Sequence, residues 1–236
     1  MAERDVNTRA RAPSGARRLA GGKIPEGMRR PALTIVLAGA ALWSCRSPPD
    51  PDAALRTAPI VLISIDTLRA DRLPAYGYAA GRTPHIDRLA REGVVFEDAY
   101  SHCPLTLPAH ASLLTGLLPP RHGVRDNIGF RLGTGHATLA SRFKSAGLRT
   151  GGAVSAYVLR ATTGIAQGFE LYDDAIETEG GTESIGTLQR DGAVTVEVLS
   201  RWIANQKGAR LFAFLHLYEP HSPYAPPERH RGLASP

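Results

Sequence analysis

A threonine, a histidine and a glycine are spaced as in a short helix whose first residues could carry out catalysis. The stretch LTLPAHASLLTG, from Leu105 to Gly116, puts Thr106 two residues before a proline and four residues before His110. Pro108 suits the first turn of a helix, and Gly116 suits its end. Two interpretations are open: Thr106 caps a helix, or it is a nucleophile at a helix start that attracts an anion.

Further polar residues come directly after two apolar runs. Asp66 follows the run IVLISI, and Glu219 and His221 follow the run LFAFLHL. Such runs are typical of interior strands in a parallel sheet, where ligands bind at the carboxyl ends of the strands. We therefore expect Asp66 and His221 to lie near Thr106. The Asp66 carboxylate suits a divalent cation that would activate the Thr106 hydroxyl, although each residue alone could be structural.

From Pro59 onward the sequence alternates between strand and helix patterns. Strands are predicted at 60–65, 94–101, 149–158 and 211–217, and helices at 83–93, 108–116, 136–147 and 191–206. This alternation predicts an α/β fold with a doubly wound, mostly parallel sheet flanked by helices. The first run should be buried on both faces, and 94–101 should be an edge or half-buried strand.

The N-terminal residues differ in charge from the rest. Residues 1–46 hold nine Arg or Lys and three Asp or Glu, which accounts for the whole formal charge of +6, and the remaining 190 residues carry 19 charges of each sign. A basic N-terminal segment before an otherwise neutral chain is typical of a targeting segment and argues against a nucleic-acid partner.

Residues 28–45, MRRPALTIVLAGAALWSC, have the pattern of a signal peptide: arginines, then an apolar stretch too short to span a bilayer comfortably. The ending resembles a bacterial lipobox, so Cys45 is the expected lipid anchor of an exported, periplasmic or cell-surface bacterial protein. Trp43 fits that box poorly, which leaves ordinary cleavage, or a buried core helix, as alternatives.

The flanking segments are interpreted from composition. We interpret residues 1–27 as a disordered lead-in, or as the result of a translation start placed too early. We interpret residues 46–58 as a Pro-rich linker. If Cys45 carries lipid, Cys103 has no intramolecular partner, and we expect it to be an inert packed thiol.

Five motifs resemble, in order and spacing, the sulfatase family of the alkaline phosphatase superfamily: ISIDTLRADRL, TPHIDRLAREGVVFEDAYS, LPAHASLLTGLLPPRHGV, QGFELYDD and LHLYEPHSPY. The resemblance covers the chain from about Pro59. It implies an alkaline phosphatase-like fold and a metal-bound nucleophile that hydrolyses a sulfate or phosphate ester of a small molecule or glycan. On this resemblance Asp66 binds metal, Thr67 stands where many members have a second aspartate, and His221 contacts the anion or leaving group. Calcium is the expected metal, with magnesium, manganese or zinc as alternatives.

The nucleophile departs from the family pattern. Sulfatases carry a Cys-x-Pro-Ser-Arg signature whose cysteine becomes formylglycine, and the aligned residues here are Thr106, Leu107, Pro108, Ala109 and His110. Thr106 is then the expected nucleophile and metal ligand, and His110 orients it. A threonine sulfate cannot expel sulfate by collapsing to an aldehyde, whereas metal-activated water can hydrolyse a threonine phosphate. This favours phosphoryl chemistry, although the motifs are sulfatase-like.

Other binding groups of the family are missing. The usual lysine and histidine are replaced around Ser155 and Tyr157, and the later Ser-Asp-His/Asn-Gly motif does not occur before Pro236. We therefore expect residues 59–236 to be the N-terminal part of a catalytic domain, incomplete at its C-terminus and with poor metal affinity. The alternative is a non-catalytic surface lipoprotein that keeps the fold as a binding scaffold. Neither the natural substrate nor the oligomeric state follows from the sequence.

Overall fold

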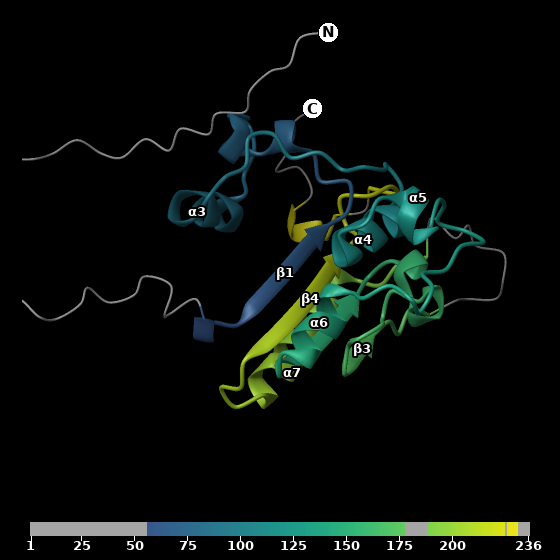
Figure 1. The fold of residues 1–236 in the computed structure, drawn as a ribbon. Coiled ribbons are helices and arrows are strands. Elements are labelled where there is room, and N and C mark those ends of the chain that lie inside the picture. Colours follow the sequence, from purple (N-terminus) through teal and green to yellow (C-terminus); the bar gives the residue numbers. More distant parts are fainter. Residues whose placement is uncertain (1–55, 178–187, 225, 231–236) are drawn as a thin grey trace, which may run out of the picture. The chain divides into compact units, whose positions relative to one another are not determined.

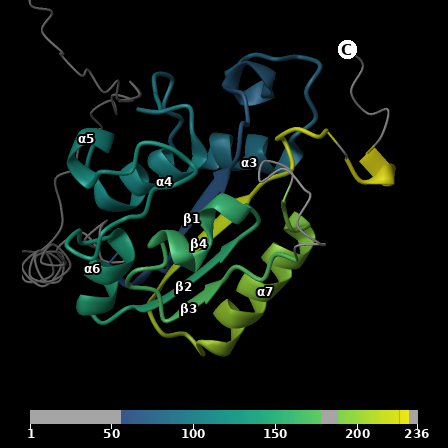
Figure 2. The ribbon, with the colours of Figure 1, turned by 90° about the vertical axis from the view of Figure 1, so that its right-hand side faces the viewer.

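Four parallel strands form one sheet in the order β1-β4-β2-β3 (Figures 1 and 2). The computed structural model describes residues 56–177, 188–224 and 226–230. The strands are β1 (Ile60–Ile65), β2 (Arg149–Val154), β3 (Leu171–Asp173) and β4 (Leu211–Leu217). The expected lead-in, the signal peptide with Cys45 and most of the expected linker lie outside the described residues.

Five α-helices and five short 3-10 helices accompany the strands in the described ranges. The α-helices are α3 (Pro84–Glu92), α4 (Thr106–Thr115), α5 (Pro119–His122), α6 (Leu139–Ser145) and α7 (Gly192–Asn205). The 3-10 helices are η1 (Ala70–Arg72), η2 (Pro74–Tyr76), η3 (Tyr157–Leu159), η4 (Ala161–Thr163) and η5 (Glu228–His230). Within these ranges no helix combines the length and the apolar character needed to cross a membrane.

Helices cover both faces of the sheet, which confirms the predicted doubly wound α/β architecture (Figure 2). On one face, apolar residues of α4 and α6 pack with Phe212 and Phe214 of β4. On the other face, α7 places Leu199 and Trp202 against Leu211, Ala213 and Leu215. Successive residues of a strand point to opposite faces, so β4 contributes alternately to the two layers.

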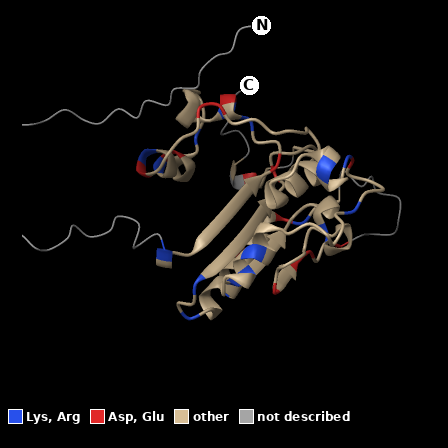
Figure 3. Cartoon of the chain, in the orientation of Figure 1, with Lys and Arg blue, Asp and Glu red and all other residues tan. Residues whose placement is uncertain are grey.

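The position of each strand in the sheet decides how deeply it is buried. Strand β4 lies between β1 and β2, and its first six residues are buried. Neither β4 nor β1 carries a Lys, Arg, Asp or Glu (Figure 3). Strand β1 is at the edge of the described sheet, and its Val61 and Ile63 are 49% and 52% exposed. The prediction that β1 is buried on both faces is therefore wrong for the described residues, because α7 packs mainly on β4 and β2.

Residues 94–101 do not form the predicted strand. Their alternating pattern has no pairing strand in the described parts of the chain, and Val94, Phe96 and Tyr100 are largely exposed. A strand needs backbone partners as well as alternation, and this segment has only the alternation.

We expect Gly151→Ala to lower the free energy of unfolding by about 1–3 kcal/mol, because overpacking an ordered core strains it. A Cβ atom at Gly151 would lie 2.6 Å from ring atoms of Trp202, at the contact between β2 and α7. Urea denaturation measures the change. Gly135→Ala is the matched control, since a Cβ there meets no atom within 4 Å, and it should change stability by less than about 0.5 kcal/mol. Equal effects of the two substitutions would contradict the close contact.

Candidate functional site

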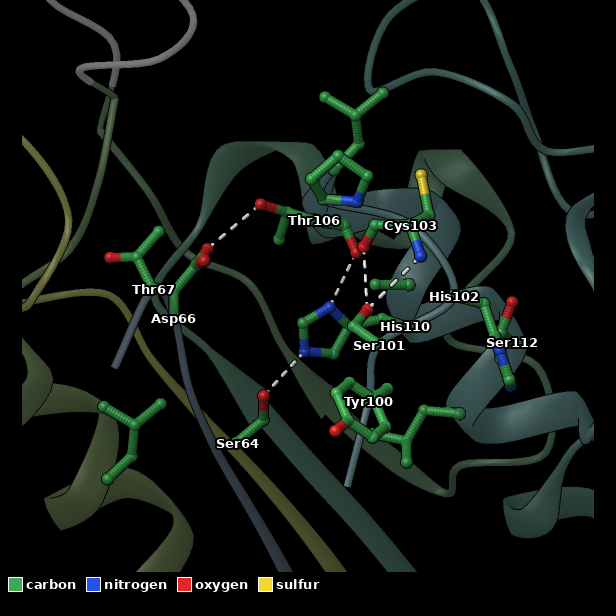
Figure 4. Close-up of a pocket in the computed structure, with 15 residues that line it drawn as sticks. Ser64, Asp66, Thr67, Tyr100, Ser101, His102, Cys103, Thr106, His110 and Ser112 are labelled. Atoms are coloured by element: carbon green, nitrogen blue, oxygen red, sulfur yellow. Dashed lines mark hydrogen bonds between the residues drawn. The ribbon is translucent and has the colours of Figure 1, made fainter. Parts of the chain in front are cut away.

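The carboxyl ends of β1 and β4 and the start of α4 meet at one edge of the sheet. Asp66 directly follows β1, and its backbone N–H donates to the carbonyl of Leu217 at 2.9 Å. The Thr106 hydroxyl donates a hydrogen bond to Asp66 Oδ2 at 3.0 Å (Figure 4). The structure therefore brings together the predicted nucleophile and the predicted metal ligand, which are 40 positions apart in the sequence.

Thr106 is the first residue of α4 and does not cap it. The cap position belongs to Leu105, which has an extended backbone and forms no side-chain capping bond. Asn127 accepts a hydrogen bond from the Leu107 N–H at 2.8 Å, and Pro108 has no N–H to offer. The helix start thus leaves fewer free amides for an anion than the sequence suggested, while the Thr106 hydroxyl is free to face Asp66.

A cavity of about 600 Å³ opens between the end of β1, the start of α4 and the segment 100–105. Asp66, Thr67 and Thr106 line it. Thr67 is exposed and has a backbone φ of 54°, a left-handed conformation that is unfavourable for a β-branched residue and is often found at functional sites. Cys103 also lines the cavity and is partly exposed, so the expectation of a packed thiol is wrong.

The Asp66 carboxyl stays ionised at neutral pH although it is mostly buried. Burial raises its pKa, but attraction to His216 and the hydrogen bond from Thr106 together lower it more, and the pKa lies below its usual value. His216 Nε2 is 3.6 Å from Asp66 Oδ2, which is longer than a hydrogen bond, so we treat this contact as an electrostatic attraction. A weakly basic carboxylate suits metal binding better than proton abstraction.

His110 is a buried, neutral histidine that holds the start of α4. Burial is the main reason that its pKa falls to about 4, and repulsion from His216 adds to the effect. Its Nδ1 is 2.7 Å from the carbonyl oxygen of Thr106 and its Nε2 is 2.8 Å from Ser64 Oγ (Figure 4). Because a carbonyl only accepts, Nδ1 carries the proton and Nε2 accepts from Ser64. His110 therefore positions the Thr106 backbone and has no free nitrogen for the Thr106 proton.

Three residues of the site were missed by sequence reasoning. These are Ser64, Asn127 and His216. Ser64 and His216 are the polar residues within the apolar runs of β1 and β4, and they are paired in the sheet register. A polar residue on the inward face of a strand was the available signal. Asn127 lies in a loop without any comparable pattern.

The described residues that follow β4 are not among those that line this cavity. The His221 ring stacks on Tyr218 with ring centres 4.4 Å apart, and its Nδ1 lies 2.6 Å from the carbonyl oxygen of Ser222. The Glu219 carboxylate accepts a hydrogen bond from the N–H of Gly192, the first residue of α7. Glu219 is therefore a helix-capping residue, and the role of His221 remains a prediction.

Asp66 and Thr106 supply part of a ligand set for a divalent cation. Their oxygen atoms are 3.0 Å apart, and hard oxygen donors suit calcium or magnesium. In the parts of the chain that the structure describes, no three His, Cys, Asp or Glu side chains gather as a metal site. The residues present fit the metal that the resemblance implies, but they do not complete its coordination.

Comparisons with known proteins bear on the family and the fold of the chain. The sequence matches the family described as Sulfatase over residues 59–233. It is 38% identical over 94 residues to an arylsulfatase of Clostridium perfringens, covering 39% of this chain and 19% of that protein.

Solved structures show the same fold. The phosphonate monoester hydrolase of Agrobacterium radiobacter superposes with a TM-score of 0.61 at 23% identity, covering 74% of this chain and 43% of that one. A protein in the alkaline phosphatase superfamily from Vibrio parahaemolyticus gives a TM-score of 0.54 at 21% identity, covering 72% and 42%. The predicted alkaline phosphatase-like fold is confirmed, and the chain spans less than half the length of each of these three proteins.

We expect the metal-free protein, kept in a chelator, to lose stability as the pH falls from 6.5 towards 4. The pKa of His110 is lowered from 6.5 to about 4 in the folded state, so in this range the unfolded chain binds a proton that the folded chain excludes. The full effect is about 3 kcal/mol. Urea denaturation across this range should give a shallower pH dependence for His110→Gln than for the wild type.

The control is His85→Gln, which changes an exposed histidine of α3. This variant should keep the pH dependence of the wild type. If His110→Gln kept it as well, the assignment of His110 as a buried neutral group would be wrong.

Proposed function

The chain belongs to the sulfatase family, and on that premise we propose that it is the N-terminal part of a sulfuric or phosphoric ester hydrolase with Thr106 as nucleophile. The proposal rests on the 3.0 Å contact between Thr106 Oγ1 and Asp66 Oδ2, inside a cavity at the carboxyl edge of a parallel sheet. The position of Thr106 in the motif LTLPAHASLLTG supports the same role.

Thr106 requires a cation because neither neighbouring side chain is a suitable base. The pKa of Asp66 is below its usual value, so its carboxylate attracts the hydroxyl proton only weakly. Both ring nitrogens of His110 are engaged by Ser64 and by the Thr106 carbonyl. A divalent cation would lower the pKa of the Thr106 hydroxyl, with calcium as our first expectation. Asp66 and Thr106 would hold it, and Thr67 is a weaker candidate.

The reaction would proceed in two displacements. The Thr106 hydroxyl would release its proton to water, and its oxygen would form a bond to sulfur or phosphorus while the bond from that atom to the ester oxygen breaks. The departing alcohol takes up a proton, for which His221 is the candidate donor. Water then attacks the esterified Thr106, which releases sulfate or phosphate and restores the hydroxyl. The second displacement is the step at which a threonine favours phosphate over sulfate, since a threonine ester lacks the aldehyde route of formylglycine.

A non-catalytic binding scaffold is the second candidate. Ser155, near the position of the family's usual lysine, is fully buried and hydrogen-bonded to Thr195 at 2.7 Å, so it does not reach the cavity. The incomplete set of metal ligands in the described residues also favours a non-catalytic scaffold. The gene sequence downstream of Pro236 separates the candidates. An in-frame Asp-His/Asn-Gly segment supports the enzyme, and a stop codon supports the scaffold.

We expect Thr106→Ala to reduce kcat/KM for ester hydrolysis by at least about 1000-fold, because the substitution removes the attacking oxygen. The complete reading frame is assayed with aryl sulfate, phosphate monoester and phosphodiester substrates, which also identifies the ester class. Thr106→Ser keeps the hydroxyl and should retain measurable activity. Thr115→Ala makes the same truncation at the far end of α4 and should leave the rate within a few-fold. Unchanged hydrolysis in Thr106→Ala would exclude the nucleophile assignment.

For the localisation, we propose an exported bacterial protein that is anchored by lipid at Cys45, in the periplasm or at the cell surface. The supporting observation is the signal-like segment 28–45 that ends in LWSC. Cells that express the wild type and are fed a labelled fatty acid should yield labelled protein. Cys45→Ser should abolish the label, whereas Cys103→Ser should keep it. Label that persists in Cys45→Ser contradicts the anchor.

A further inference from the structure

His216 is a buried histidine whose ring has no hydrogen-bond partner among the described residues. It is the sixth residue of β4 and is 0% exposed, and neither Nδ1 nor Nε2 is hydrogen-bonded. Buried polar side-chain atoms nearly always have a partner, and a lone unpaired imidazole costs stability. Packing alone would favour an apolar residue at this position, as at Phe212 and Phe214 on the same face.

The surroundings of His216 point to Asp66 as its partner. The Nε2 atom is 3.6 Å from Asp66 Oδ2, and the His216 ring meets the His110 ring edge-on with centres 4.9 Å apart. Ser64 is the sheet neighbour of His216, but Ser64 and His110 are already bonded to each other. A shift of about 0.6 Å would bring Nε2 within hydrogen-bond distance of the carboxylate.

The Asp66 oxygen that faces His216 is the one that accepts the bond from Thr106. When Thr106 gives up its proton to attack an ester, Oδ2 loses that donor. A carboxylate left without it in a largely buried site would be free to turn or to attract the nucleophile's proton back. A second donor behind the carboxylate prevents both.

We propose that His216 is a positioning residue whose Nε2–H takes over Asp66 Oδ2 when the Thr106 hydroxyl is deprotonated or removed. The inference rests on the proposed role of Thr106 as nucleophile and of Asp66 as metal ligand. Partners in the outer shell of metal ligands fix the orientation of those ligands, and losing one typically weakens metal binding 10–100-fold. His216 touches neither substrate nor metal in this scheme and acts through Asp66.

The first test compares calcium affinity with stability in protein from the complete reading frame. His216→Phe keeps a ring but removes the donor, so its calcium dissociation constant in calorimetry should rise 10–100-fold. Its metal-free melting temperature should be no lower than that of the wild type, since an unpaired polar group is removed. His216→Gln keeps an N–H near the position of Nε2 and should recover part of the affinity.

The matched control is His122→Phe. His122 is also buried, at 2% exposed, but both of its ring nitrogens are hydrogen-bonded, to Ser112 at 3.0 Å and to the Val124 N–H at 3.1 Å. This variant should melt at a lower temperature and keep the calcium affinity. If His216→Phe melted lower and kept its calcium affinity, as the control is expected to, His216 would be a packing residue and the proposal would be overturned.

The second test needs neither metal nor activity, so it separates this proposal from the proposed function. Thr106→Val removes the hydroxyl donor to Asp66 while keeping the shape of the side chain. In the metal-free variant the His216 Nε2–H proton resonance should move downfield and exchange more slowly with water as the bond to Asp66 forms. An unchanged resonance overturns the inference. If the wild type neither binds calcium nor hydrolyses any ester, the proposed function fails, and this resonance still decides the role of His216.

Discussion

The hydrogen bond between Thr106 and Asp66 depends on the close approach of one helix start to the end of one strand. Asp66 is held by its backbone bond to Leu217, which ties the end of β1 to the end of β4. Thr106 is held through its carbonyl, which contacts the ring of His110, and His110 is in turn bonded to Ser64 on β1. The 3.0 Å hydrogen bond between Thr106 and Asp66 thus depends on a set of bonds that fixes α4 on the sheet. Loosening any of these bonds would separate the nucleophile from its carboxylate.

The polar residues beneath the cavity lower the stability of the fold, because burying polar side chains costs free energy. Ser64, His110 and His216 lie where apolar side chains would pack without any polar atom to satisfy. Burial keeps His110 neutral and lowers its pKa to about 4, while Asp66 remains charged. A site with one fixed negative charge beside the neutral ring of His110 keeps the same charge pattern at neutral pH. Stability alone would not select these residues, which is consistent with a functional reason for their presence.

Features set by neighbouring residues could be predicted from the sequence, whereas features set by residues distant in the sequence could not. Local periodicity was enough for α7 and β4, and the helix-start and strand-end patterns pointed to Thr106 and Asp66, to which the family resemblance added their expected roles. The burial of β1 was mistaken because its place at the edge of the described sheet is set by distant residues. Residues 94–101 alternate like a strand, but pairing depends on a neighbour that the pattern does not reveal. The contacts of Ser64, Asn127 and His216 join segments distant in sequence and follow only from the packed structure.

The charge of the cavity sets a condition on any anionic ester that enters it. The side chains that line it include Asp66 and no Lys or Arg, within the residues that the structure describes. His110, which also lines it, is neutral because of its low pKa. A sulfate or phosphate ester would therefore meet the negative charge of Asp66, and at short range two like charges repel strongly where water is partly excluded. A divalent cation on Asp66 and Thr106 would both offset this negative charge and activate the hydroxyl.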